Sequence, residues 1–153
     1  MRREVSYLPE LPHQMNMDNK RVGSNVHKII DLCETVTGTH AVLMISLPTC
    51  RPCHDSLSEF LQQNKRLQIP FACLTMADEG EYYQMFCHDY GAQVEILPIN
   101  ETQLKRMGVN RFPTFLIIDN NGIILREFIL VEYLIRYIEQ MPISMQIGKK
   151  DEK

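Results

Sequence analysis

Two cysteines separated by two residues form the arrangement in this chain best suited to two-electron chemistry. Cys50 and Cys53 lie between a β-branched apolar run and an amphipathic stretch, which places them at a strand-to-helix junction. A helix that begins at Cys50 directs unsatisfied backbone N–H groups and the positive end of its dipole at that sulfur, so the thiolate is favoured near neutral pH. Cys53 lies one helical turn further on and can close a disulfide with Cys50. The pair therefore predicts exchange between a dithiol and a disulfide.

The remaining three of the five cysteines fit apolar patterns. Cys33 and Cys87 match the spacing of a buried helix face, and Cys73 lies in a strand-like run. Free cysteine behaves as a small buried hydrophobe, so we expect these three thiols to pack in the core. The odd total argues against a fully bridged secreted scaffold and favours a reducing, cytoplasmic environment.

Composition limits the possible classes of function. The 153 residues, 44% of them hydrophobic, suffice for one globular domain with a single core. The net charge of -3, with both signs interspersed, gives no electrostatic case for nucleic acid or for an anionic membrane surface. The longest apolar run, Ala41 to Ile45, is too short to span a bilayer, and no apolar segment follows the basic N-terminal residues. We expect a monomeric cytoplasmic protein that neither binds nucleic acid nor inserts into a membrane.

Helical and strand periodicities alternate along the chain, which predicts an α/β domain with parallel strands joined by crossover helices. We expect an irregular N-terminal arm over 1–22, the domain over 23–141 and a flexible charged tail over 142–153. The predicted helices cover about 24–37, with Ser24 as its cap, and about 51–65, 80–90, 101–108 and 130–140. The predicted strands cover about 40–47, 70–76 and 93–97, followed by a hairpin over about 114–128 that turns at Asn120-Asn121-Gly122.

Two separated segments of the chain together form a recognisable pattern. The first is Cys50-Arg51-Pro52-Cys53, after a strand and at the start of a helix. The second runs from Gly108 to Leu116 and contains Pro113 followed by Thr114. Together they resemble the thioredoxin-fold thiol-disulfide oxidoreductases, whose Gly-Val-x-x-apolar-Pro-Thr segment contains a cis-proline. The helix and strand predicted at 80–97 are similar to the central insertion of one branch of that family. The resemblance implies a thioredoxin fold, with a central mixed β-sheet flanked by helices and a helix–strand insertion before the cis-proline.

The resemblance also implies roles for particular residues. Cys50 would be the attacking thiol and Cys53 the resolving thiol, with Pro113 as the cis-proline beside them. Phe112 and Pro113, together with Thr49, would bind an extended substrate peptide. The partner would be a protein or peptide that contains a thiol or a disulfide. No cofactor is implied beyond the redox-active Cys50–Cys53 disulfide, and no metal.

The two residues between the thiols depart from the Gly-Pro of thioredoxin. A charge on Arg51 near Cys50 would stabilise the thiolate, and so make the disulfide more oxidising than thioredoxin's potential of about -270 mV. An ordinary surface position at the helix N-terminus is the alternative for Arg51. Pro52 suits the first helical turn because its missing N–H costs nothing there. Together, Arg51 and Pro52 would tune the reactivity of Cys50.

A second departure concerns the proton of the resolving thiol. The buried acid that thioredoxin places six residues before its first cysteine falls here on Met44, so proton removal from Cys53 needs another group or water. A dedicated partner therefore fits better than service as a general reductant. The chain also resembles the thioredoxin-like accessory proteins of bacterial peptide toxins of the sporulation killing factor type. That resemblance implies a role in bacteriocin biosynthesis, with a disulfide-containing peptide as substrate.

Three alternatives to thiol exchange remain open at the level of sequence. The run from Cys50 to His54 matches the attachment pattern of haem c, although attachment normally follows export. Zinc could bind Cys50 and Cys53 with further ligands from Cys87 and His88. A non-catalytic adaptor could use the fold's peptide groove with the thiols incidental. His54 could also tune the thiol pair, but its place in the first helical turn predicts that it faces solvent.

Overall fold

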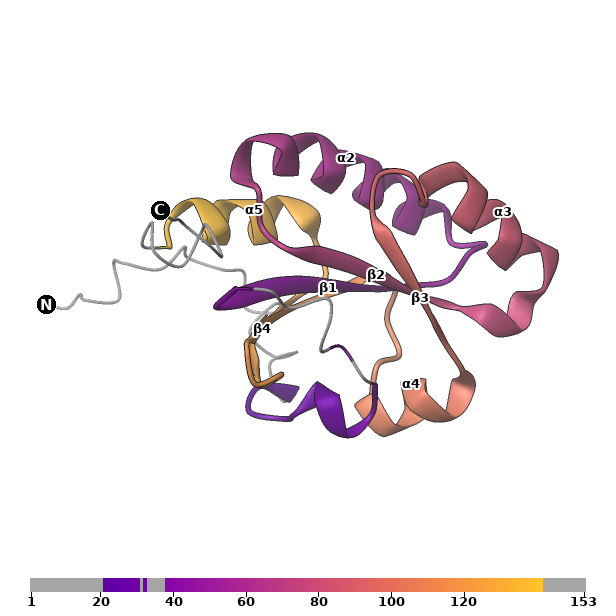
Figure 1. Cartoon of the computed structure of the whole chain (residues 1–153), viewed down its shortest axis with the longest axis horizontal. Coiled ribbons are helices and arrows are strands. Elements are labelled where there is room, and N and C mark those ends of the chain that lie inside the picture. Colours follow the sequence, from indigo (N-terminus) through magenta and orange to yellow (C-terminus); the bar gives the residue numbers. More distant parts are fainter. Residues whose placement is uncertain (1–20, 31, 33–37, 142–153) are drawn as a thin grey trace, which may run out of the picture.

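A five-stranded mixed β-sheet forms the centre of the protein in the computed structural model, which describes residues 21–30, 32 and 38–141 (Figure 1). The strands are β1 (His40–Ser46), β2 (Phe71–Met76), β3 (Glu95–Ile99), β4 (Thr114–Asp119) and β5 (Ile124–Phe128). Their order across the sheet is β3-β2-β1-β4-β5. β1, β2 and β3 run parallel, whereas β4 is antiparallel to β1 and β5 is antiparallel to β4. The predicted α/β class with a mixed sheet is confirmed.

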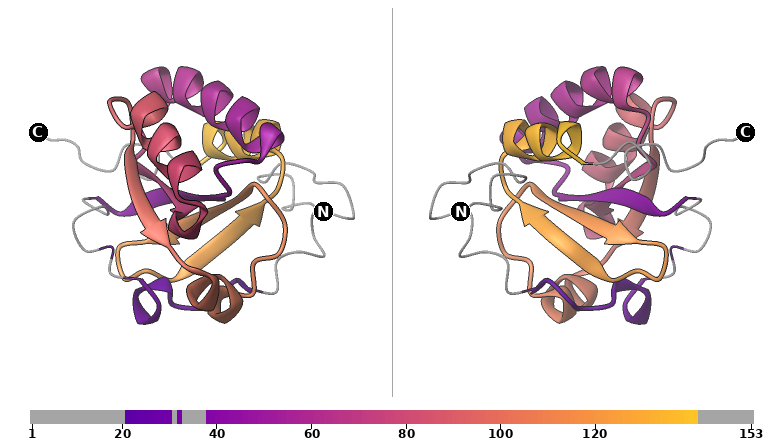
Figure 2. Two further views of the ribbon diagram at one scale, coloured as in Figure 1. Left: turned by 90° about the vertical axis from the view of Figure 1, so that its right-hand side faces the viewer. Right: turned by 90° about the vertical axis from the view of Figure 1, so that its left-hand side faces the viewer.

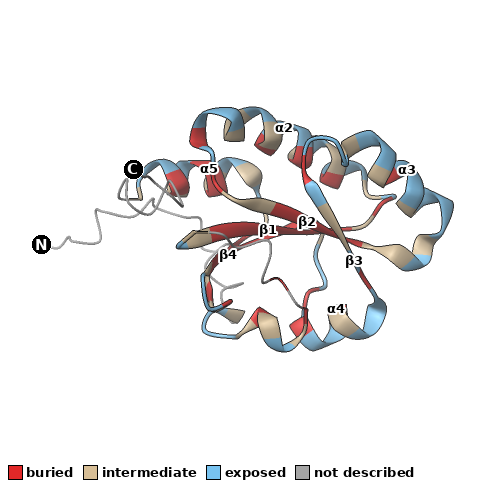
Figure 3. Cartoon of the chain, in the orientation of Figure 1, coloured by how far each residue is buried: buried red, intermediate tan, exposed pale blue. Residues whose placement is uncertain are grey.

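Helices cover both faces of this sheet (Figure 2). One face carries α2 (Arg51–Leu67), α3 (Glu81–Tyr90) and α5 (Val131–Glu139). The other face carries α4 (Glu101–Met107) and the short 3-10 helix η3 (Val26–Lys28). Each layer encloses its own core of apolar side chains, so the central strand β1 is buried on both faces (Figure 3). This double burial explains why β1 is apolar almost without interruption.

The helix and strand predicted as an insertion form α3 and β3, and a 3-10 turn, η4 (Ala77–Glu79), leads into α3. β3 lies at the edge of the sheet and pairs only with β2 among the described strands. Its Pro98 is tolerated because an edge strand has one side that needs no ladder hydrogen bond. The insertion thus widens the sheet on the side of β2.

Local signals placed the ends of several elements correctly. Asn100 and Gln103 form the predicted capping box at the start of α4, with both reciprocal hydrogen bonds present. α4 ends at Gly108, whose φ of 76° is in the left-handed region. The turn between β4 and β5 has Gly122 at φ 83°, as the hairpin prediction requires.

The predicted helix over 24–37 is wrong at its start. Ser24 does not cap a helix; its carbonyl accepts from the N–H of Ile124 at 2.9 Å, and the N–H of Val26 donates to the carbonyl of Gly122 at 2.8 Å. These bonds attach the segment to the β4–β5 hairpin, and among its described residues the 3-10 helix η3 follows, capped by Asn25. Residues 31 and 33–37, and with them Cys33, lie outside the described residues, as do 1–20 and the predicted tail 142–153.

Arg21, assigned from sequence to the irregular arm, is bonded to the domain. Its guanidinium forms an ion pair with the buried Glu127 of β5 and hydrogen bonds to the backbone carbonyls of Met107, at 3.2 Å, and Gly108. The residue therefore joins the N-terminal segment to the sheet and to the C-terminal end of α4.

Candidate redox site

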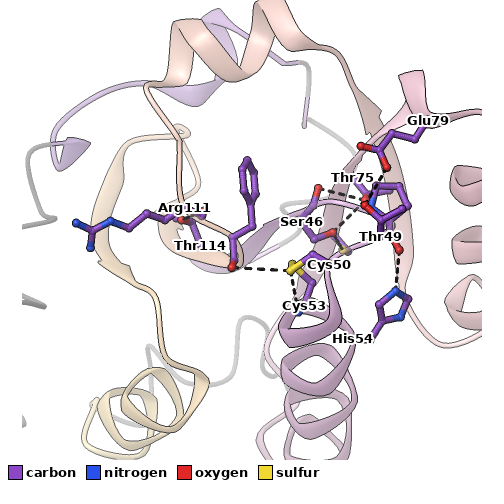
Figure 4. Close-up of a disulfide and its surroundings, with 12 residues drawn as sticks. Ser46, Thr49, Cys50, Cys53, His54, Thr75, Glu79, Arg111 and Thr114 are labelled. Atoms are coloured by element: carbon purple, nitrogen blue, oxygen red, sulfur yellow. Dashed lines mark hydrogen bonds between the residues drawn. A yellow bond between two sulfur atoms is a disulfide. The ribbon is translucent and has the colours of Figure 1, made fainter.

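Cys50 and Cys53 form a disulfide at the N-terminus of α2, with their Cα atoms 5.2 Å apart (Figure 4). Cys50 is the N-cap residue, and its sulfur accepts a hydrogen bond from the N–H of Cys53 at 3.1 Å. Cys50 is half-buried, whereas Cys53 is wholly buried among the apolar side chains under α2. An incoming sulfur can therefore reach Cys50 but not Cys53.

The loop before Pro113 leads into β4, the strand next to β1, and lies beside this disulfide. The peptide bond between Phe112 and Pro113 is cis, and the carbonyl oxygen of Phe112 lies 3.9 Å from Sγ of Cys50. Thr114 closes the loop through a hydrogen bond from its hydroxyl to the carbonyl of Arg111, at 2.7 Å. Phe112 is half-buried and Pro113 is buried. The two segments named from sequence are thus adjacent in space.

A tight turn connects β1 to α2 and ends at Cys50. The N–H of Cys50 donates to the carbonyl of Leu47 at 3.1 Å, with Pro48 and Thr49 at the two central positions. Pro48 is buried, while Thr49 is exposed and its hydroxyl donates to the Glu79 carboxylate of η4 at 3.2 Å. Thr49 therefore lies at the solvent side of the disulfide.

His54 does not face solvent, contrary to the sequence prediction. Its Nε2 lies 2.8 Å from the carbonyl oxygen of Pro48, and its Nδ1 lies 2.9 Å from the hydroxyl of Tyr90 at the end of α3. The ring also packs edge-on against Phe86, with centroids 5.3 Å apart. The prediction failed because α3 covers this side of α2, and the first-turn position alone gives no sign of that contact.

The residues expected to tune the thiols occupy the first turn of α2. Arg51 and Pro52 are its first two residues, and both are exposed. Met44, which stands where thioredoxin has an acid, is fully buried.

A buried polar cluster lies where β1 and β2 end, consisting of Ser46, Cys73 and Thr75. Ser46 Oγ lies 3.4 Å from the Cys73 sulfur and donates to the Thr75 hydroxyl at 3.0 Å. Burial raises the pKa of the Cys73 thiol to about 12, and the hydrogen bond with Ser46 opposes this shift. Cys73 packs in the core as predicted, whereas Cys87 is only half-buried.

The donor set proposed for zinc is not assembled in the described part of the chain. No group of three or more histidine, cysteine or acidic side chains there is placed to hold a metal ion. His88 is 90% exposed on the outer side of α3.

Solved structures share this architecture, although no protein-family model and no curated protein matches the chain. The thioredoxin domain of a thiol-disulfide oxidoreductase from Bacteroides vulgatus aligns with a TM-score of 0.57 at 12% identity, over 70% of this chain and 81% of that one. The exposed lipoprotein thioredoxin of Streptococcus pneumoniae aligns with a TM-score of 0.56 at 14% identity, over 71% and 90%. The chain has a thioredoxin fold. A thiol:disulfide interchange protein from Chlorobium tepidum, with a TM-score of 0.53 at 18% identity over 70% and 79%, shares it.

Within this thioredoxin fold, sequence reasoning missed the neighbours that hold the site. Pro48, Glu79 and Tyr90 all contact residues around the disulfide; Tyr90 belongs to the inserted helix α3, and Glu79 lies in η4 just before it. The helical periodicity of α3 could have identified Tyr90 as inward-facing, but not its partner.

In the described part of the chain, no helix has the length and apolarity needed to cross a bilayer.

Proposed function

We propose that the protein is a thiol-disulfide oxidoreductase that exchanges a dithiol for a disulfide with a protein or peptide partner. The observation that carries the proposal is the pairing of a half-buried Cys50 with a fully buried Cys53 at the N-terminus of α2. The N–H of Cys53 and the helix dipole both favour a thiolate on Cys50. The thioredoxin fold of the solved structures described above supports the same chemistry.

In the reducing direction, the Cys50 thiolate attacks one sulfur of the partner's disulfide. A mixed disulfide forms, and the other partner sulfur leaves as a thiolate. Cys53 then loses its proton and attacks Cys50, which forms the Cys50–Cys53 disulfide and releases the second partner thiolate. The partner gains two electrons and two protons, and the reverse sequence installs a disulfide in it.

Thr49, Phe112 and Pro113 would bind the partner's chain around this disulfide. Thr49 is exposed on one side of Cys50, and the Phe112 carbonyl lies on the other. Arg51 and Pro52 would tune the thiolate from the first turn of α2. Met44 leaves the site without the buried acid of a general thioredoxin, which favours a dedicated disulfide-containing peptide as the substrate. We further propose that the protein is a monomer and acts in the cytoplasm.

The reduction potential of the Cys50–Cys53 pair tests the direction of exchange. The protein is equilibrated with glutathione buffers and its free thiols are trapped and counted. A potential near -270 mV or lower supports a reductase, and one above about -230 mV supports an oxidase or isomerase. A pair that forms no disulfide in any buffer would overturn the proposal in favour of an adaptor.

Serine variants of the two cysteines test their separate roles. Cys50→Ser is expected to abolish reduction of a disulfide substrate such as insulin, because the attacking sulfur is lost. Cys53→Ser is expected to accumulate the mixed disulfide, because nothing resolves it. The rate of insulin reduction measures the first outcome, and mass spectrometry of the trapped adduct measures the second. An unchanged rate in Cys50→Ser contradicts the assignment, whereas peptide binding without any exchange in the unmodified protein supports the adaptor.

A further inference from the structure

The imidazole of His54 connects the turn before Cys50 with the inserted helix α3. The proposed exchange reaction assigns no role to this connection. Its Nε2 contacts the carbonyl oxygen of Pro48 at 2.8 Å, and its Nδ1 contacts the Tyr90 hydroxyl at 2.9 Å. Pro48 belongs to the turn that delivers Cys50, and Tyr90 is the last residue of the inserted helix α3. A chain of hydrogen bonds therefore runs from the insertion to the residues just before the attacking sulfur.

The carbonyl of Pro48 determines which protons the ring carries. A carbonyl oxygen only accepts hydrogen bonds, so Nε2 of His54 must be the donor. In the neutral ring Nδ1 then accepts from the Tyr90 hydroxyl. Both ring nitrogens have partners, and the edge-on contact with Phe86 holds the ring plane.

The bond to Pro48 acts on the one peptide plane that can rotate within this turn. The N–H of Cys50 bonds to the carbonyl of Leu47, so the Pro48–Thr49 peptide is the central unit of a β-turn. The two common β-turn types differ by rotation of that central peptide. By holding the Pro48 carbonyl, His54 selects one orientation, and the orientation of the next residue, Cys50, follows from it.

We propose that His54 is a positioning residue for thiol exchange, and that Tyr90 couples it to the inserted helix. This inference rests on the proposed function of Cys50 and Cys53. His54 fixes the Pro48–Thr49 peptide, which keeps the Cys50 sulfur aligned with the N–H of Cys53 and with the dipole of α2. The insertion thereby sets the reactivity of the attacking thiol without contacting the partner's disulfide.

The rate at which iodoacetamide alkylates Cys50 in the reduced, full-length protein at pH 7 measures this alignment. His54→Phe keeps a ring against Phe86 but removes both hydrogen bonds. Loss of the positioning bond to the Pro48 carbonyl is expected to slow alkylation about fivefold, the effect of one ordinary hydrogen bond. The equilibrium with glutathione is expected to shift by a similar factor toward the disulfide, because the thiolate of the reduced form is destabilised. Peptide mapping by mass spectrometry assigns the adduct to Cys50.

Two further variants separate positioning from packing. His54→Gln can still donate to the Pro48 carbonyl and is expected to restore most of the rate. Tyr90→Phe loses only the hydroxyl that contacts Nδ1 of His54, and it is expected to slow alkylation of Cys50 by about twofold. This variant provides the test if His54→Phe does not fold. His88→Phe, the same exchange at an exposed position of α3, is the matched control and is expected to leave the rate unchanged.

Each outcome decides one part of the inference. An unchanged alkylation rate in a folded His54→Phe overturns the positioning role, and a loss that His54→Gln does not restore assigns the effect to packing instead. An unchanged alkylation rate in Tyr90→Phe overturns the coupling to α3. Alkylation does not require that the protein exchange disulfides, so a failure of the proposed function would appear separately, as the absence of a Cys50–Cys53 disulfide in glutathione buffers.

Discussion

The cysteines of this protein differ in what surrounds their sulfur atoms. Cys50 is half-buried and accepts an N–H hydrogen bond at a helix N-terminus, whereas Cys73 is fully buried beside the Ser46 hydroxyl. A thiolate is the reactive form of cysteine, and burial without a compensating charge disfavours it. We therefore expect the Cys50 thiol to be far more reactive than the Cys73 thiol.

Cys73 is expected to resist alkylation in the folded protein. Its pKa rises from 9.0 to about 12, so its thiolate fraction at pH 7 falls about a thousandfold below that of an unperturbed cysteine. Mass mapping after iodoacetamide treatment of the reduced protein should show adduct on Cys50 long before Cys73. Both thiols should react in guanidinium chloride, which serves as the control. Rapid modification of Cys73 under native conditions would contradict its burial.

Among the elements, the β4–β5 hairpin depends on one glycine. Gly122 has φ 83°, and a Cβ added there would meet ring atoms of His27 at 2.3 Å. The same turn accepts the backbone hydrogen bond from Val26. The hairpin turn and the η3 segment therefore pack too closely for a side chain.

Gly122→Ala is expected to lower the free energy of unfolding by more than about 2 kcal/mol, because a positive φ alone costs about 1–2 kcal/mol for alanine. Gly23→Ala is the matched control, since Gly23 has φ 97° but open space around a built Cβ, and only the backbone cost of about 1–2 kcal/mol applies. Urea denaturation measures both variants. Equal losses would mean that His27 moves aside freely.

At the scale of the whole molecule, the ion pair of Arg21 and Glu127 ties the N-terminal segment to the sheet. The Glu127 side chain is 2% exposed and that of Arg21 is 12% exposed. Arg21 also bonds to the carbonyl of Gly108, where the loop to Pro113 begins. Arg21 thus supports the start of the loop that faces Cys50.

Arg21→Met is expected to destabilise the protein by about 3 kcal/mol or more, because it leaves a buried carboxylate without its guanidinium. Combining Arg21→Met with Glu127→Leu should recover much of that loss. Arg66→Met provides the comparison, since the Arg66–Glu139 pair is exposed and is expected to contribute less than about 1 kcal/mol. The midpoints of urea denaturation give all three values. Similar losses for Arg21→Met and Arg66→Met would refute the buried pair.

Local patterns in the sequence determined most of the elements and the centre of the site. Cys50 and Cys53 lie at the start of α2 with two residues between them, Asn100 and Gln103 cap α4, and the Asn-Gly turn closes the hairpin. Each of these signals depends on residues that are close together in the sequence, within one or two helical turns or one hairpin turn. Such signals can therefore be read from the sequence alone. The pairing of the thiol motif with the Pro113 segment required the resemblance to a known fold as well.

Tertiary structure alone decided the contacts that hold the site. His54 was expected in solvent, but its ring is half-buried and contacts the hydroxyl of Tyr90, which is 36 residues away. Ser24 was expected to start a helix, but the hairpin bonds its backbone instead. Local propensity for a helix or an exposed side chain is weak compared with burial of apolar surface and satisfaction of backbone hydrogen bonds. The sequence determined which sulfurs can react, and the packing of α3 against α2 decided what surrounds them.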